Sequence, residues 1–271
     1  MTIETTFNIP NVRKGHRVDI EGHTLYWFET DHPGETPRSL LEIFDLYLNQ
    51  YQWDKLIDPG STVVDIGAHS GDTAIPMQFI ARGTVLAIEP NPIIRPFLDF
   101  NCNMNGHLGK FITAGEAITT EDTPAVEILD HHNALCNGGL IDKSWSQALQ
   151  DRMRAMAGDK FTVPGLTLEH ILEKYLTPEE IANISFIKTD TEGHDISILE
   201  SSANFLDRVR PVIFTEWFFA YTDVENRKMF KVIEDLGYEA FYPKTLGRAT
   251  IDKPSEDLVL IHKSQIEPAL K

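Results

Sequence analysis

Acidic side chains follow two apolar segments that the sequence predicts to be strands. Asp190 comes directly after residues 184–189, and Glu216 comes directly after residues 211–215. The carboxyl ends of parallel strands meet at one edge of a sheet, where ligands bind, so we expect both side chains to face the same crevice. Carboxylates at such an edge can hold Mg²⁺ or Mn²⁺, bind substrate hydroxyls or act as a general base.

Further titratable residues follow Asp190 at the start of a predicted helix, namely Glu192, His194 and Asp195. A carboxylate at a helix N-terminus commonly caps the helix, and this accounts for Asp195. We expect His194 or Asp190 to take a proton from a bound hydroxyl. The alternatives are a solvated first-turn histidine at position 194, and a divalent ion on Asp190 and Glu216 that lowers the hydroxyl pKa.

Two glycines, Gly67 and Gly71, lie four residues apart between a predicted strand and a predicted helix. They would let the backbone approach a ligand at the free N–H groups of the helix start. The middle glycine of the NAD fingerprint and the Lys-Ser/Thr of a P-loop are both missing. Glu89, which ends the next strand, can accept hydrogen bonds from both ribose hydroxyls. This combination indicates a nucleoside ligand without pyrophosphate, and S-adenosylmethionine (SAM) fits; a purely structural turn is the alternative.

The elements that must position these residues alternate between strands and helices from residue 62 onward. Such alternation predicts an α/β fold with a mostly parallel sheet covered on both faces. The predicted strands cover residues 63–66, 85–88, 111–114, 184–189, 211–215, 238–242 and 258–262. The predicted helices cover residues 72–80, 92–103, 195–202 and 225–236.

Two regions stand apart from this alternation. Residues 1–60 are predicted to be a lead-in, with a strand or hairpin at 18–28 and a helix that Ser39 caps, packed on the core. Residues 61–271 then form one domain. Within that domain the segment 119–160 is too long for an ordinary connection. It is interpreted as a lid or substrate loop, with a surface elaboration as the alternative.

The chain of 271 residues carries 24 basic and 41 acidic side chains, a formal charge of −17. Such a chain is repelled by nucleic acid and by anionic membrane surfaces, so neither is expected as a partner. No apolar run is long enough to predict a membrane span, and the N-terminus has no signal-peptide pattern. With only two cysteines, a reducing cytoplasmic location is expected.

Four segments of the chain resemble FkbM-type SAM-dependent methyltransferases. They are VVDIGAHSG, AIEPN, IKTDTEGHDISILES and PVIFTEW, within residues 60–262. Residues 163–169 also resemble a family segment, with Glu169 where the family has Asp. The resemblance implies a Rossmann-like class I methyltransferase fold with an antiparallel final strand. It also implies methyl transfer to a hydroxyl oxygen, of a sugar or glycan or of a small molecule.

The resemblance further implies roles for individual residues. The acceptor would face Asp190, Glu192, His194 and Glu216, the catalytic candidates. The methionine part of SAM would lie along Asp65, Gly67, His69 and Gly71. Glu89 would hold the ribose, with Asn91 beside it in Glu89-Pro90-Asn91, and Glu116 and Ala117 would lie near the adenine.

Several rival interpretations stay open at this point. The chain could be a catalytically inactive SAM-binding or scaffold protein; an NAD-dependent oxidoreductase is disfavoured by the missing glycine, and a nucleic-acid methyltransferase by the charge. Trp217, Phe218, Phe219 and Tyr221 could stack on a sugar or belong to the core. His131, His132 and Cys136 are interpreted as loop residues without a catalytic or metal-binding role. The acceptor and the oligomeric state are not predicted.

Overall fold

The computed structural model describes residues 3–9, 12–29, 39–133, 136–141, 145–156, 158–253 and 255–269. The side chains of His131, His132 and Cys136 lie outside that description, so the interpretation of them stays a prediction. Among the described residues, no helix is both long and apolar enough to cross a membrane.

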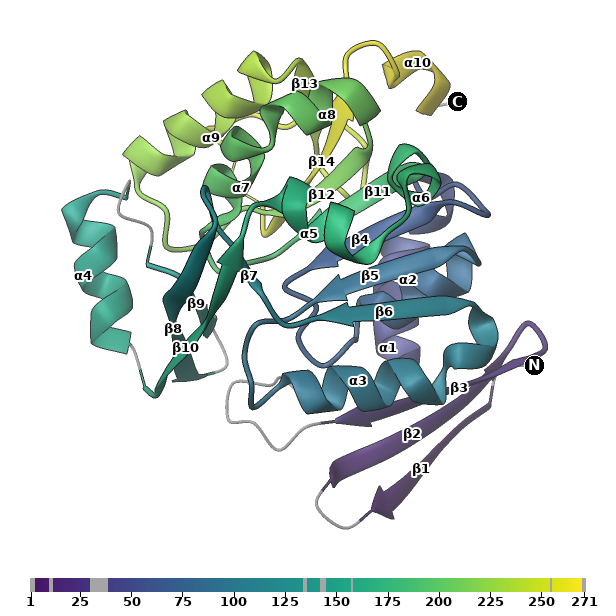
Figure 1. The fold of residues 1–271 in the computed structure, drawn as a ribbon. Coiled ribbons are helices and arrows are strands. Elements are labelled where there is room, and N and C mark those ends of the chain that lie inside the picture. The colour runs from purple at the N-terminus through teal and green to yellow at the C-terminus, as the bar shows by residue number, and fades with distance from the viewer. Residues whose placement is uncertain are drawn as a thin grey trace.

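A seven-stranded sheet forms the centre of the molecule (Figure 1), in the order β13-β14-β12-β11-β4-β5-β6. All neighbouring pairs are parallel except those made by β14, which is antiparallel to both β12 and β13. The predicted fold class, a mostly parallel sheet with an antiparallel final strand, is confirmed. The strands are β4 (Thr62–Ile66), β5 (Thr84–Ile88), β6 (Lys110–Ala114), β11 (Ile184–Thr189), β12 (Val212–Glu216), β13 (Tyr238–Phe241) and β14 (Asp257–His262).

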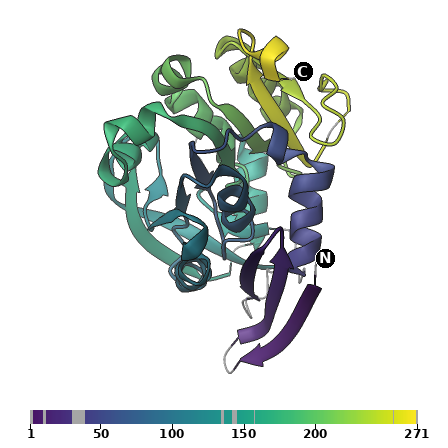
Figure 2. The same cartoon turned by 90° about the vertical axis from the view of Figure 1, so that its right-hand side faces the viewer.

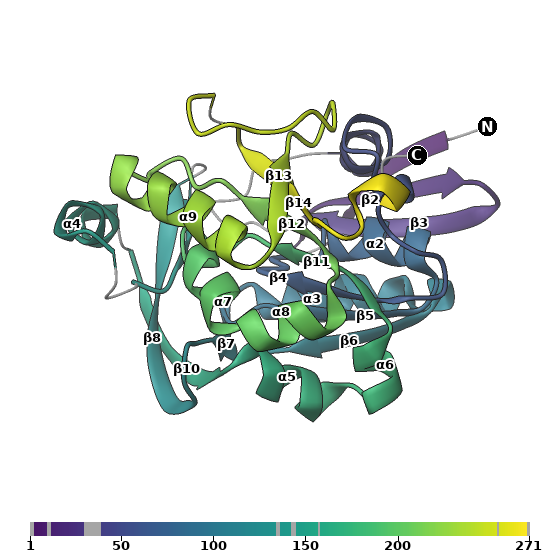
Figure 3. The ribbon, with the colours of Figure 1, turned by 90° about the horizontal axis from the view of Figure 1, so that it is seen from above.

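Alternate residues of the central strands enter two different hydrophobic cores, one on each face of the sheet. Figure 3 shows helices on both of these faces. Val64 and Ile66 face the core that includes α5 (Leu168–Tyr175), α7 (Asp195–Ser201), α8 (Ala203–Val209) and α9 (Asp223–Asp235). Val63 faces the other core, with α1 (Leu40–Phe44), α2 (Ala74–Ala81) and α3 (Arg95–Met104). Burial on both faces explains why the strands are short, continuous apolar runs.

Residues that the sequence predicts to be a lead-in form an antiparallel sheet, β1 (Ile3–Ile9), β2 (Val12–Ile20) and β3 (His23–Glu29). Figure 2 shows this sheet extending from the body of the molecule. Two asparagine side chains, one in α3 and one directly after it, take the place of a further strand at the edge of β3. Asn101 exchanges two hydrogen bonds with the backbone of Phe28, and Asn105 exchanges two with Tyr26.

The predicted insertion is not an irregular loop. It contributes β8 (Thr123–Asn133), β9 (Cys136–Gly139) and α4 (Gln147–Met156). With β7 (Ala117–Ile118) and β10 (Lys160–Leu166), the strands form a second sheet in the order β7-β10-β8-β9. The remaining α-helices of the described residues are α6 (Pro178–Ala182) and α10 (Ile266–Ala269). Three short segments have other helical forms: a π-helix, η1 (Asp45–Gln50), and two 3-10 helices, η2 (Trp53–Lys55) and η3 (Gly106–Leu108).

Candidate active site

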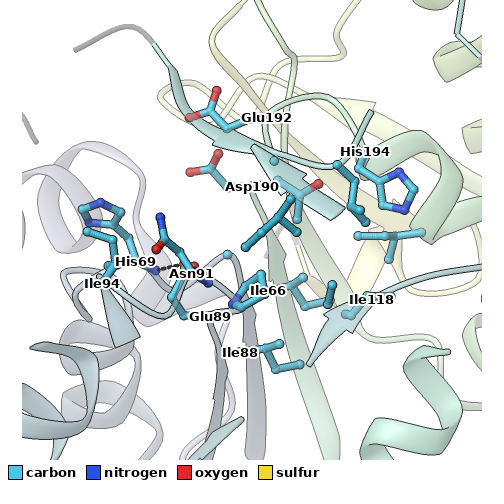
Figure 4. A pocket seen from close by; sticks show the side chains of 18 of the residues that line it. Ile66, His69, Ile88, Glu89, Asn91, Ile94, Ile118, Asp190, Glu192 and His194 are labelled. Carbon is cyan, nitrogen blue, oxygen red and sulfur yellow. Dashed lines mark hydrogen bonds between the residues drawn. The ribbon is translucent and has the colours of Figure 1, made fainter. Parts of the chain in front are cut away.

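A pocket lies between the carboxyl ends of β4, β5 and β11 and the second sheet. It encloses about 800 Å³, part of which is open solvent. Figure 4 shows His69, Glu89 and Asn91 on one side and His194 on the other, with Asp190 and Glu192 between them. Its wall also contains many aliphatic side chains, and the second sheet supplies part of it. These side chains are Ile66, Ile88, Ile94, Ile118, Ile128, Leu129, Leu140 and Ile198.

The turn after β4 brings the backbone to the pocket. The N–H groups of Gly67 and Ala68 both donate to the carbonyl of Ile88, at 3.0 Å each. Gly67 has φ +73°, and a Cβ there would lie 1.9 Å from the carbonyl oxygen of Asp190, so this position requires glycine. Gly71 closes the turn at the start of α2 by donating to the carbonyl of Ala68. Gly67 lines the pocket and Gly71 does not.

Glu89 is fixed in the pocket wall by two backbone donors. The N–H of His69 donates to its Oε2 at 2.9 Å, and the N–H of Asn91 donates to its Oε1 at 2.7 Å. Burial raises the pKa of Glu89 to about 7, although both hydrogen bonds oppose the shift. Each carboxylate oxygen keeps a further lone pair, so the group can still accept from a ligand.

Asp130, which the sequence analysis does not single out, ties the second sheet to this wall. It is buried on β8, and its Oδ1 accepts from the side-chain amide of Asn91 at 3.2 Å. The Asn91 Oδ1 accepts from the N–H of Ile93 at 2.9 Å, which fixes the orientation of the amide. The side chain of Asn91 therefore connects the Glu89 wall with the second sheet. No motif marks Asp130, because the contact joins segments 39 residues apart.

The loop between β11 and α7 is folded around Asp195, the first residue of α7. The N-cap of this helix is His194, which makes no side-chain capping bond, so Asp195 binds the preceding loop and does not cap the helix as the sequence predicts. Asp195 Oδ1 accepts from the Thr189 hydroxyl at 2.5 Å and from the N–H of Thr191 at 3.2 Å. Its Oδ2 accepts from the N–H of Gly193 at 3.3 Å. This arrangement leaves Asp190, Glu192 and His194 as pocket-lining residues. The Asp190 side chain is 43% exposed, whereas His194 is buried.

Besides Gly71, three further predicted site residues do not line the pocket. Asp65 is fully buried beneath it, where its Oδ2 accepts from Thr73 at 2.5 Å. Glu116 binds Lys174 and the hydroxyl of Tyr175. Glu216 lies at the end of β12, outside the lining set. Ala117, which follows Glu116, does line the pocket.

The carboxyl group of Glu216 is in an unfavourable environment for a negative charge. Burial raises its pKa well above the ordinary value, and the charges of Asp190, Glu192, Asp195 and Asp257 add to the effect. Within the described ranges, no group of three or more His, Cys, Asp or Glu side chains is placed to hold a metal ion. The prediction that Asp190 and Glu216 bind Mg²⁺ or Mn²⁺ therefore gains no support from this arrangement.

Most of the aromatic residues that follow Glu216 belong to the core. Trp217, Phe218 and Tyr221 are buried, and the Tyr221 hydroxyl donates to the carbonyl of Gly193 at 2.8 Å. Phe219 is 49% exposed, with the guanidinium of Arg152 5.3 Å from its ring centre. Three of the four therefore belong to the core rather than to a stacking surface, and Tyr221 supports the loop that carries Asp190, Glu192 and His194.

Comparison with known proteins identifies the class to which this fold and pocket belong. Residues 65–240 match the model of the methyltransferase FkbM domain. Because the match spans well over half of the chain, the chain belongs to the FkbM methyltransferase family. No curated protein matches the chain.

Solved structures of methyltransferases are similar at low sequence identity. An FkbM methyltransferase from Methylobacillus flagellatus is 15% identical with a TM-score of 0.48, and the match covers 85% of this chain and 49% of that one. This chain thus spans about half the length of that protein. M. jannaschii TYW2, solved in complex with AdoMet, is 14% identical with a TM-score of 0.41, over 90% of this chain and 82% of that one. Aeropyrum pernix fibrillarin, solved with natively bound S-adenosyl-L-methionine, is 13% identical with a TM-score of 0.40, over 96% and 98%.

Proposed function

We propose that this chain is a SAM-dependent O-methyltransferase that acts on a hydroxyl of a small molecule, or of a sugar or glycan. The observation that carries the proposal is the Glu89 carboxylate, held by two backbone donors in the pocket wall. A carboxylate at the end of the second strand of such a sheet is suited to two neighbouring ribose hydroxyls.

The rest of the pocket fits a nucleoside that carries no phosphate. Among the described lining residues there is no lysine or arginine, so a pyrophosphate would find no charged partner there. The aliphatic part of the wall, with Ile118, Ile128 and Leu129, suits the faces of a purine ring. Gly67 and His69 also line the pocket, and we place the more polar end of the ligand beside them.

Bound SAM supplies a methyl group on a positively charged sulfur, and an acceptor oxygen can attack the carbon of this methyl group in line with the carbon–sulfur bond. The chain then has to orient the acceptor and take up its proton. His194 and Asp190 both line the pocket at its β11 edge, and either can serve as the base. His194 is the better placed for a proton transfer away from water, because it is buried while Asp190 is partly exposed.

The same features support the expected kind of acceptor. Glu89, Asp190 and Glu192 give the pocket wall an acidic character, which favours hydroxyl donors over anionic groups. The formal charge of −17 likewise favours a small-molecule or carbohydrate acceptor over nucleic acid. A cytoplasmic location is part of the same proposal, because the cytoplasm supplies SAM.

The test is methyl transfer from radiolabelled SAM to a panel of sugars, glycosides and hydroxylated natural products. Label is expected to move to an oxygen of at least one acceptor, with release of S-adenosylhomocysteine. Activity should persist after EDTA treatment, because the described residues offer no three-ligand metal site. Binding of S-adenosylhomocysteine with no transfer to any acceptor, and no hydrolytic turnover, would support the inactive SAM-binding alternative instead.

A further inference from the structure

Lys188 is a buried lysine that the proposed chemistry does not use. It is the second-last residue of β11, and its side chain is 4% exposed. A buried ammonium is costly unless several partners replace its water. The groups that surround the Lys188 ammonium therefore indicate the role of this residue.

Three acceptors surround the ammonium group, one for each of its N–H donors. The Lys188 Nζ donates to the carbonyl oxygen of Gly67 at 2.7 Å. It lies 3.4 Å from Oδ1 of Asp65 and 3.4 Å from Oδ2 of Asp190. Burial alone lowers the pKa of Lys188, but Asp190 and Asp65 together outweigh it and raise the pKa above the ordinary value. The side chain is therefore charged wherever the protein is folded near neutral pH.

Two of these partners belong to separate turns that both line the pocket. Gly67 follows β4 and Asp190 follows β11. The turns already touch, because the N–H of Asp190 donates to the carbonyl of Ile66 at 3.1 Å. The ammonium adds a second link, from the carbonyl of one turn to the carboxylate of the other.

The third partner anchors this link from below the pocket. The other carboxylate oxygen of Asp65 accepts from the hydroxyl of Thr73, one residue before α2. Asp65 thus holds the ammonium in place without contacting the ligand space.

We infer that Lys188 is a positioning residue that fixes the Gly67 turn and the Asp190 carboxylate in the geometry that the pocket requires. Its effect on cofactor binding rests on the proposed function, whereas its effect on the two turns does not. The competing role is purely structural: Lys188 would only neutralise the buried carboxylate of Asp65.

Three variants separate these roles. Lys188→Met leaves Asp65 without a buried counter-charge and is expected to be unstable. Asp65→Asn/Lys188→Met removes both charges and keeps an acceptor for Thr73, so its stability should return toward that of the wild type. Asp65→Asn alone keeps the links from Lys188 to Gly67 and Asp190. Lys231→Met, at an exposed surface pair with Asp235, is the matched control.

Amide hydrogen exchange reads the turns directly, without any ligand. The N–H groups of Gly67, Ala68, Gly71, Asp190 and Thr191 all donate hydrogen bonds within the folded chain. In the double variant we expect their exchange to be faster by about tenfold or more, with unchanged exchange in β5 and β14. In Asp65→Asn and Lys231→Met they should exchange as in the wild type.

Calorimetric titration with S-adenosylhomocysteine gives the second measurement. The double variant should bind it about tenfold or more weakly than the wild type, and turnover should fall by about 100-fold, as small displacements of a site can cause. Wild-type exchange in both turns of the double variant would overturn the inference. Amide exchange in the turns that is accelerated as much by Asp65→Asn as by Lys188→Met would also overturn the inference. If the wild-type protein does not bind S-adenosylhomocysteine but the turns of the double variant still exchange faster, the result contradicts the proposed function and still supports the positioning role.

Discussion

The Glu89 carboxylate is the residue on which cofactor recognition depends most directly in this account. Its pKa is raised to about 7, so the group is partly protonated at neutral pH. A ligand whose hydroxyls donate to the carboxylate stabilises the ionised form, and binding therefore releases protons at and below this pKa. Affinity should be full at higher pH and should fall as the pH drops below about 7.

The first prediction follows from this direction of the pH dependence of the affinity. The affinity for S-adenosylhomocysteine should decrease by about fivefold or more between about pH 8 and about pH 6, by the linkage of a single titrating group. Titration calorimetry in two buffers of different ionisation enthalpy also measures the proton release. Glu89→Gln should bind weakly at both pH values, and Glu127→Gln, at an exposed pair with Lys160, should behave as the wild type. An unchanged pH dependence in Glu89→Gln would contradict the role of this carboxylate.

His194 carries the second prediction at this scale. His194→Ala should lower kcat by about 10²–10⁴-fold, the usual contribution of a general base. S-adenosylhomocysteine binding should stay within about threefold, because the base acts on the acceptor rather than on the cofactor. If the variant turns over normally, Asp190→Asn is the next variant to test, and the histidine is then only part of the loop.

At the scale of elements, the site depends on two turns packed backbone against backbone. Gly67 has φ +73° and a Cβ position 1.9 Å from the Asp190 carbonyl oxygen, so a side chain there has to separate β4 from β11. Gly60 provides a matched comparison, because it has φ +81° but no atom near its Cβ position. The two glycines therefore share a left-handed backbone conformation, which would strain any other residue, and differ only in how closely other atoms pack around them.

The third prediction uses this pair of positions. Gly60→Ala should lower the free energy of unfolding by about 1 kcal/mol, the cost of a left-handed conformation for alanine. Gly67→Ala should cost at least about 2 kcal/mol, because a backbone clash adds to the same strain. Urea unfolding measures both. Equal losses for the two variants would show that the turns are not in the close contact described.

Local hydrophobicity explains which strands could be predicted from the sequence. The central strands are apolar runs buried on both faces, so their positions follow from composition alone. The second sheet has no such signal: β10 contains Pro164-Gly165 and is bulged between Val163 and Gly165. β10 pairs with residues of β8 that are distant from it in the sequence. The local sequence of β10 therefore does not show the pairing, and it is more typical of a loop.

The site residues divide on similar physical grounds. Gly67, His69, Glu89 and Asp190 line the pocket because strand-end positions meet at one edge of the sheet. Asp65 lies one residue before Ile66, and alternate side chains on a strand face opposite sides, so Asp65 faces away while Ile66 lines the pocket. Glu116 is drawn to Lys174, 58 residues later in the chain, which no local pattern could show.

At the scale of the whole molecule, two hydrophobic cores hold the sheet while the second sheet closes the pocket beside its carboxyl edge. The wall of the pocket thus comes from segments as distant as Gly67 and His194, and they meet only in the folded state. A ligand that fills the pocket should therefore stabilise the entire fold and not one loop, because it binds the native state alone.

The central claim is that this pocket binds a nucleoside cofactor without phosphate, and calorimetric titration with S-adenosylhomocysteine, supported by a thermal shift, tests it most directly. At about 100 times the dissociation constant, binding should add about 2.7 kcal/mol to the free energy of unfolding. In a chain of this size that raises Tm by roughly 5–10 °C, with no shift for NAD. Neither heat of binding nor a shift with S-adenosylhomocysteine, or an equal shift with NAD, would contradict the account.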